Sequence, residues 1–106
     1  RGFQAIDPGR LSPAEQVALF AESAVIVGPH GAGLTNEVFA APEVPLVEIA
    51  NPAWRQPYFT NLAVAVGRPY MVIDAEPVVA DDRPTLFWNM KATDETVAAV
   101  LDALPD

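Results

Sequence analysis

The chain has 106 residues, of which 51% are hydrophobic and 19% charged, a balance typical of one folded domain and not of a disordered segment. Its net charge of −8 argues against nucleic acid as a partner, because proteins that bind nucleic acid present a basic face. With no cysteine, disulfide bonds and thiolate metal sites are excluded. No apolar run approaches the ~20 residues of a membrane span.

The amino-terminal part is expected to form a strand, a turn and a helix. Residues 2–6 alternate weakly and favour a short strand, which the turn residues Asp7-Pro8-Gly9 would close. Ser12 fits the N-cap of a helix, with Pro13 at the first helical position and Glu15 completing a capping box. The opening reads like the middle of a domain, so residues 1–106 are expected to form a single, partial domain.

The stretch VIVGPHGAGLTN at 25–36 is the most informative part of the chain. The continuous apolar run from Ala24 to Val27, β-branched at residues 25–27, predicts a strand covered on both faces, and a glycine-rich turn and a helix start follow it. The first N–H groups of a helix have no intrahelical partner, and the helix dipole leaves that end positive. Phosphate is the usual guest at such an end.

The remaining elements are taken from apolar spacing and turn residues. The spacing predicts a second helix with an apolar stripe of Leu34, Val38 and Phe39, followed by a strand at 45–49 and a loop at 51–54. A third helix, which would end at Gly67, carries the apolar residues Phe59, Leu62, Ala63 and Val66, and a strand at 70–73 follows it. Thr93 is expected to cap a last helix, whose apolar face is formed by Val97, Val100, Leu101 and Leu104. Between 74 and 91 the pattern fades, although residues 86–88 are apolar.

Alternating strands and helices with short connections predict an α/β, Rossmann-like three-layer domain with a small parallel sheet and helices on both faces. Ligands of such sheets bind at the carboxyl ends of the strands. The glycine turn at 28–33 and the segment from Glu48 to Pro52 are both expected at that edge.

The glycine turn fits two phosphate-binding motifs only in part. Leu34 stands where a P-loop needs lysine, and Asn36 stands where a dinucleotide fold needs its third glycine. A diphosphate cradle built from the amides of residues 31–34 needs neither. The alternative is that these glycines only turn the chain and let the helix pack closely on the sheet.

His30 and Glu48 are the two side chains with the strongest claim to chemistry. His30 is the single histidine and stands at the mouth of the expected cleft, where it could donate to a phosphate or a sugar hydroxyl, or act as a base. Glu48 ends an apolar strand, where a carboxylate needs a partner. A ribose diol and a salt bridge to Arg55 or Arg68 are the alternatives.

Several of these segments resemble a known family. Ser12, Glu15 and Gln16, the helix that follows, the run from Gly28 to Asn36, Phe39, and Val47-Glu48-Ile49 resemble the carboxyl-terminal part of the family 61 glycosyltransferases. The resemblance extends from about residue 2 to residue 70. The family includes bacterial capsular-polysaccharide enzymes and eukaryotic xylosyl- and N-acetylglucosaminyltransferases.

The resemblance implies the donor-binding lobe of a two-lobed GT-B enzyme. Such an enzyme inverts the anomeric centre, takes a nucleotide-sugar donor, expected here to be a UDP-sugar, and needs neither metal nor further cofactor. A glycan acceptor would be held by an amino-terminal lobe that this chain lacks, and a bacterial cytoplasmic location is expected. The alternative is a nucleotide- or phosphate-binding module without activity of its own.

In this interpretation, the site residues divide by role. His30 is the catalytic candidate, Glu48 would bind the ribose, and the nucleotide-sugar would be held by the amides of Gly31, Ala32, Gly33 and Leu34 with side-chain hydrogen bonds from Thr35 and Asn36. The amides would stabilise the leaving diphosphate as its charge develops.

Overall fold

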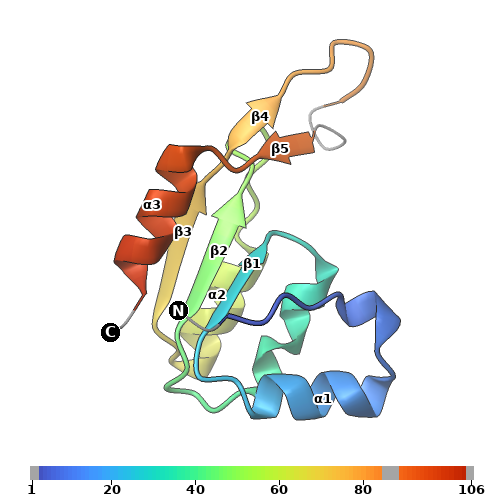
Figure 1. Ribbon diagram of the computed structural model, residues 1–106, viewed down its shortest axis with the longest axis vertical. Coiled ribbons are helices and arrows are strands. Elements are labelled where there is room, and N and C mark those ends of the chain that lie inside the picture. Colours follow the sequence, from blue (N-terminus) through green and yellow to red (C-terminus); the bar gives the residue numbers. More distant parts are fainter. Residues whose placement is uncertain (1–2, 85–88, 105–106) are drawn as a thin grey trace.

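The computed structural model describes residues 3–84 and 89–104, which form an α/β domain around a parallel sheet. Its strands are β1 (Ile26–Pro29), β2 (Leu46–Ala50) and β3 (Tyr70–Asp74), in the order β1-β2-β3. Figure 1 shows helices on both faces of this sheet. The predicted α/β class with a small parallel sheet is therefore confirmed. Its expected likeness to a lobe of a GT-B enzyme stays a prediction.

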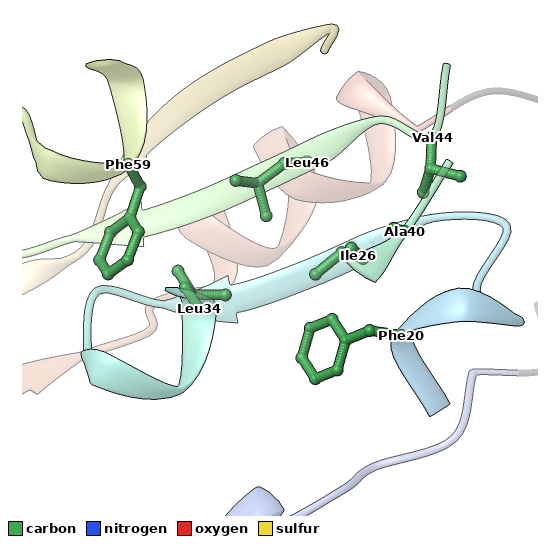
Figure 2. Packing of buried hydrophobic residues seen from close by; sticks show 7 residues of the cluster. All are labelled: Phe20, Ile26, Leu34, Ala40, Val44, Leu46 and Phe59. Atoms are coloured by element: carbon green, nitrogen blue, oxygen red, sulfur yellow. The ribbon is translucent and has the colours of Figure 1, made fainter. Parts of the chain in front are cut away.

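Three helices cover one face: α1 (Pro13–Ala21), the 3₁₀ helix η2 (Ala32–Phe39) and α2 (Tyr58–Val66). They share one apolar cluster with the sheet, shown in Figure 2 and formed by Phe20, Ile26, Leu34, Ala40, Val44, Leu46 and Phe59. Full burial of a leucine or phenylalanine side chain contributes about 1.5–3 kcal/mol. This cluster therefore accounts for much of the stability that holds η2 beside β1.

The other face is covered by α3 (Asp94–Ala103), with Val47, Ile73 and Leu104 at the centre of a second cluster. The predicted apolar face of α3 is half wrong, because Val97 and Leu101 are exposed. The inward face instead carries small residues and the buried Thr96. The Thr96 hydroxyl donates to the Asp74 carbonyl at 3.3 Å, which fixes the rotation of α3 on β3.

The predicted helix ends are confirmed. The Ser12 hydroxyl accepts from the Glu15 N–H at 3.2 Å, and the Glu15 carboxylate accepts from the Ser12 N–H at 3.0 Å, so the capping box is complete. Thr93 caps α3 in the same way, with Thr96 in place of the acid. Gly67 ends α2 with φ +82°, a left-handed conformation that favours glycine.

Two segments differ from the sequence-based predictions. Residues 3–6 form no strand, and a 3₁₀ turn, η1 (Pro8–Arg10), follows them. In the segment where the pattern fades, β4 (Glu76–Val78) pairs antiparallel with β5 (Asn89–Lys91). Strands of three residues are too short to show a period. The apolar residues 86–88 lie outside the described residues.

The second predicted helix is present as η2, but its apolar stripe was predicted correctly only in part. Leu34 is buried, whereas Val38 and Phe39 are exposed. Gly33, Thr35 and Asn36 are poor helix formers, and the segment adopts the tighter 3₁₀ geometry, which places other residues inward. Among the residues described, no helix is long and apolar enough to cross a membrane.

Candidate functional site

His30, Glu48 and Tyr70 lie together beside the parallel sheet, with His30 just past the carboxyl end of β1 and Tyr70 at the first residue of β3. His30 Nδ1 lies 2.9 Å from Glu48 Oε2, and the Tyr70 hydroxyl donates to Glu48 Oε1 at 2.6 Å. The backbone N–H of His30 also donates to the backbone carbonyl of Ile49 at 2.9 Å, which fixes the backbone of His30 to the end of β2. The histidine and the glutamate, predicted separately as site residues, are therefore direct partners.

Strand alternation explains why these side chains meet. Side chains two residues apart point to the same face of a sheet, and Glu48 lies two residues after Leu46, whose side chain belongs to the cluster under α2 and η2. Gly28 pairs with Glu48 across the sheet, and His30 follows Gly28 by two. Tyr70 pairs with Leu46 on the opposite side of β2.

The burial of this pair is asymmetric, which limits what each side chain can do. The Glu48 side chain is 2% exposed and the His30 side chain 15% exposed. A carboxylate only accepts hydrogen bonds, so Nδ1 must carry the proton that His30 gives to Glu48. Nε2 of His30 is then the ring nitrogen left for a ligand, as an acceptor in the neutral ring and as a donor in the charged one.

Tyr70 closes the other side of Glu48. Burial, followed by the hydrogen bond to Glu48, raises the pKa of Tyr70 to about 12. The phenol therefore stays protonated and donates to Glu48 across the physiological pH range. No local pattern predicts this role, because Tyr70 begins a strand and resembles an ordinary half-buried residue.

Neither arginine proposed as a partner of Glu48 takes that place. Arg55 pairs with Asp74 at the surface, and Arg68 pairs with Glu37 in the interior. The salt-bridge alternative for Glu48 is therefore wrong. Both oxygens of Glu48 already have protein partners, which argues against the expected ribose contact, because a ribose would have to displace one of them.

Arg68 and Glu37 form a second buried pair that the sequence did not predict. Both side chains are 0% exposed, with Arg68 Nε at 3.3 Å from Glu37 Oε1. The guanidinium also donates to the backbone carbonyls of Glu37, Ala40, Ala41 and Val44. Burial raises the pKa of Glu37, and the charge of Arg68 opposes that shift. The pair thereby holds the end of η2 and the loop that follows it.

The glycine turn opens η2, and it differs from expectation in its backbone. Gly31 precedes the helix with φ 172°, an extended conformation that any residue adopts. Among the described glycines, the left-handed conformation occurs at Gly67, outside this turn. A Cβ on Gly33 would meet only ordinary contact, with Pro8 Cγ at 3.7 Å. The tight approach is at Gly28, where a Cβ would lie 2.9 Å from Leu34 Cδ2. The alternative in which the glycines let the helix pack closely on the sheet therefore applies to Gly28, and not to Gly31 or Gly33.

The polar groups of the turn are only partly open to a ligand. The first bond of η2 runs from the Leu34 N–H to the Gly31 carbonyl at 3.0 Å, so Leu34 does not offer a free amide. The N–H groups of Ala32 and Gly33 precede that first bond and point to the open end of the helix. The Asn36 side chain donates to Gln16 Oε1 at 2.9 Å, whereas Thr35 is exposed.

A groove of about 1160 Å³ runs along β1 beside residues 3–8. β1 is an edge of the described sheet, which leaves this side of the strand open. His30, Gly31 and Gly33 all line the groove. It is large enough for a nucleotide-sized ligand, and it places the open end of η2 and His30 on one cavity wall.

A family model with the description "Glycosyltransferase 61" matches residues 1–47. These residues include α1, β1, the glycine turn and η2. Over that part, the chain is a glycosyltransferase family 61 sequence. The predicted resemblance is thereby confirmed, and His30, Gly31 and Gly33 fall within the matched residues.

Two plant proteins are similar to this chain. The beta-1,2-xylosyltransferase RCN11 of Oryza sativa subsp. japonica is 42% identical over 49 residues, which are 46% of this chain and 9% of that protein. The beta-1,2-xylosyltransferase of Arabidopsis thaliana is 32% identical over 80 residues, which are 71% of this chain and 15% of that protein. The chain thus spans a small part of each relative's length. None of the solved structures matches it.

These relatives correct one expectation. A bacterial cytoplasmic location was expected, and the matching proteins are plant xylosyltransferases, so that expectation was wrong. Within the described part of the chain, no three His, Asp or Glu side chains cluster in a way that would hold a metal ion. A reaction without metal stays a prediction.

Proposed function

We propose that this chain is the donor-binding half of an inverting, metal-independent glycosyltransferase that moves a sugar from a UDP-sugar to a glycan acceptor. The single observation that carries the proposal is the position of His30. It lies at the carboxyl edge of a parallel sheet, beside the open end of η2, in a segment that matches family 61. The names of the two relatives make UDP-xylose the first donor to test.

In this proposal, the amides of Ala32 and Gly33 hold the diphosphate at the positive end of η2. Thr35, which is exposed, adds a side-chain hydrogen bond. Leu34 contributes packing and not an amide, and Asn36 steadies η2 through Gln16. The charge that develops on the leaving diphosphate is met by groups already in place, which is the main electrostatic contribution available to such a site.

His30 acts through Nε2, and Glu48 orients it. Glu48 keeps the proton on Nδ1, and Tyr70 holds Glu48 from the other side. A protonated Nε2 donates to the departing phosphate oxygen more strongly as charge develops there. Glu48 is thus a positioning residue in this proposal, in place of the ribose contact.

The proposal is tested by titrating the full-length protein with UDP in the presence of EDTA, by calorimetry. Binding that survives chelation is expected, and binding that needs a divalent ion would contradict the metal-free cradle. Gly33→Val should abolish UDP binding, because the added methyl groups crowd the exposed amides. Since Gly33 is exposed and a Cβ there meets ordinary contacts, the variant should melt close to the wild type.

A further inference from the structure

Three aromatic side chains surround His30. Its ring centroid lies 5.0 Å from that of Phe59, 5.8 Å from that of Trp54 and 5.9 Å from that of Tyr58. Phe59 is part of the apolar core, but Tyr58 is 58% exposed and Trp54 is half-buried. Tyr58 thus leaves a large aromatic surface in solvent next to the proposed catalytic side chain.

The loop that carries Trp54 is held in one conformation by its own hydrogen bonds. The Trp54 N–H donates to the Asn51 carbonyl at 3.1 Å, and the Ala53 N–H donates to Asn51 Oδ1 at 3.0 Å. The Asn51 side chain also donates to the carbonyl of Asn89 in β5 at 3.4 Å. Tyr58 is the first residue of α2. The backbone that carries both rings is therefore ordered before any ligand arrives, which lowers the entropy cost of binding.

We infer that Trp54 and Tyr58 form an aromatic platform against which the sugar ring of the donor packs. The inference rests on the proposed function, in which His30 meets the diphosphate at its departing oxygen, the atom bonded to the sugar. The apolar C–H face of a pyranose suits an exposed aromatic face.

The alternative occupant of the platform is the nucleobase, which also stacks on aromatic rings. The position of His30 favours the sugar. His30 both lines the groove with Gly31 and Gly33 and contacts the two rings. A diphosphate at the glycine turn would then have its departing end at His30, and the group beyond that end is the sugar.

The test compares two ligands that differ only by the sugar. Affinities for UDP-xylose and for UDP are measured by calorimetry on the full-length protein and on the Tyr58→Ala and Trp54→Ala variants. We expect each variant to bind UDP-xylose about 10-fold more weakly, at the upper end of aromatic contact effects, with UDP affinity unchanged. Tyr58→Phe keeps the ring and should bind both ligands like the wild type.

Val64→Ala serves as the matched control, since Val64 is an exposed residue of the same helix. Equal losses for UDP and UDP-xylose would overturn the inference and assign the platform to the base. Unchanged affinity for both ligands in both variants would also overturn it. If the wild type binds neither ligand, the proposed function fails first, an outcome that is distinct from loss in the variants alone.

Discussion

Two carboxylates are buried in the described part of the chain, Glu37 and Glu48, and their partners give them different roles. Glu37 pairs with Arg68, and both side chains are fully enclosed. Glu48 pairs with His30, whose ring keeps 15% exposure and lines a groove. A pair sealed from solvent can only hold the fold together. A pair in which one member reaches the cavity is able to act on a ligand.

The two carboxylates also differ in how completely their hydrogen bonds are satisfied. Arg68 satisfies four backbone carbonyls at the end of η2 and the following loop, so its charge replaces a C-terminal cap. Oε2 of Glu37 has no hydrogen-bond partner among the described residues. Glu48, in contrast, has a partner for each oxygen. The pair proposed to act on a ligand is thus the better satisfied of the two.

The largest expected effect is on the sealed pair. Arg68→Ala leaves Glu37 and several carbonyls buried without partners, so it should lower the free energy of unfolding by about 3–5 kcal/mol in urea titrations. Arg55→Ala is the control, because the Arg55–Asp74 pair is half exposed and should be worth less than about 1 kcal/mol. Equal costs for the two arginines would remove the distinction between sealed and open pairs.

The next effect concerns Tyr70, the outer partner of Glu48. Tyr70→Phe removes a hydrogen bond to a carboxylate and should cost about 1.5 kcal/mol of unfolding free energy. The folded pKa, about 12, lies above the ordinary value of 10.0, so the stabilisation is complete below pH 10 and is lost as pH rises towards 12. Urea unfolding of both proteins across that range measures the difference. A gap that widens with rising pH would contradict this sign.

A change of similar size is expected in catalysis when Glu48 becomes Gln. The amide keeps the shape but weakens the hold on His30 Nδ1, so kcat should fall about 10-fold, which corresponds to a loss of about 1.4 kcal/mol in transition-state stabilisation. The donor KM should change little. A raised KM with normal kcat would instead return Glu48 to the ribose role.

The smallest effect separates stability from chemistry at the start of α1. Ser12→Ala removes the N-cap hydrogen bond to Glu15 and should cost ~1 kcal/mol of unfolding free energy, measured by the shift in melting temperature. Turnover well below that temperature should stay normal. Lost turnover without a change in melting would place Ser12 in the site.

Local rules predicted the parts of the fold that depend on neighbouring residues. The capping box at Ser12, the stop at Gly67 and the buried strand at 45–49 each follow from residues close in sequence, and each is present. The inward faces of η2 and α3 were predicted less well. Those faces depend on 3₁₀ geometry and on the close packing of α3 against β3, and apolar spacing reports neither.

The sequence predicted where the candidate site residues lie in the sheet, but it did not predict the hydrogen bonds between their side chains. Both His30 and Glu48 were expected at the carboxyl edge, because parallel strands end there together. Their direct hydrogen bond, and the reach of Tyr70 to Glu48, depend on the register between three strands. Residues 22 positions apart in the chain give no local signal of such a bond.

The central claim is that His30 acts on the departing diphosphate, and steady-state kinetics of His30→Ala in the full-length protein test it most directly. Donor concentration would be varied, with melting measured beside it. We predict that kcat falls by about 10²-fold or more while the donor KM changes little, because a hydrogen bond that strengthens with developing charge acts mainly on the transition state. Normal kcat in a folded His30→Ala variant would contradict the account and leave His30 a packing partner of Glu48.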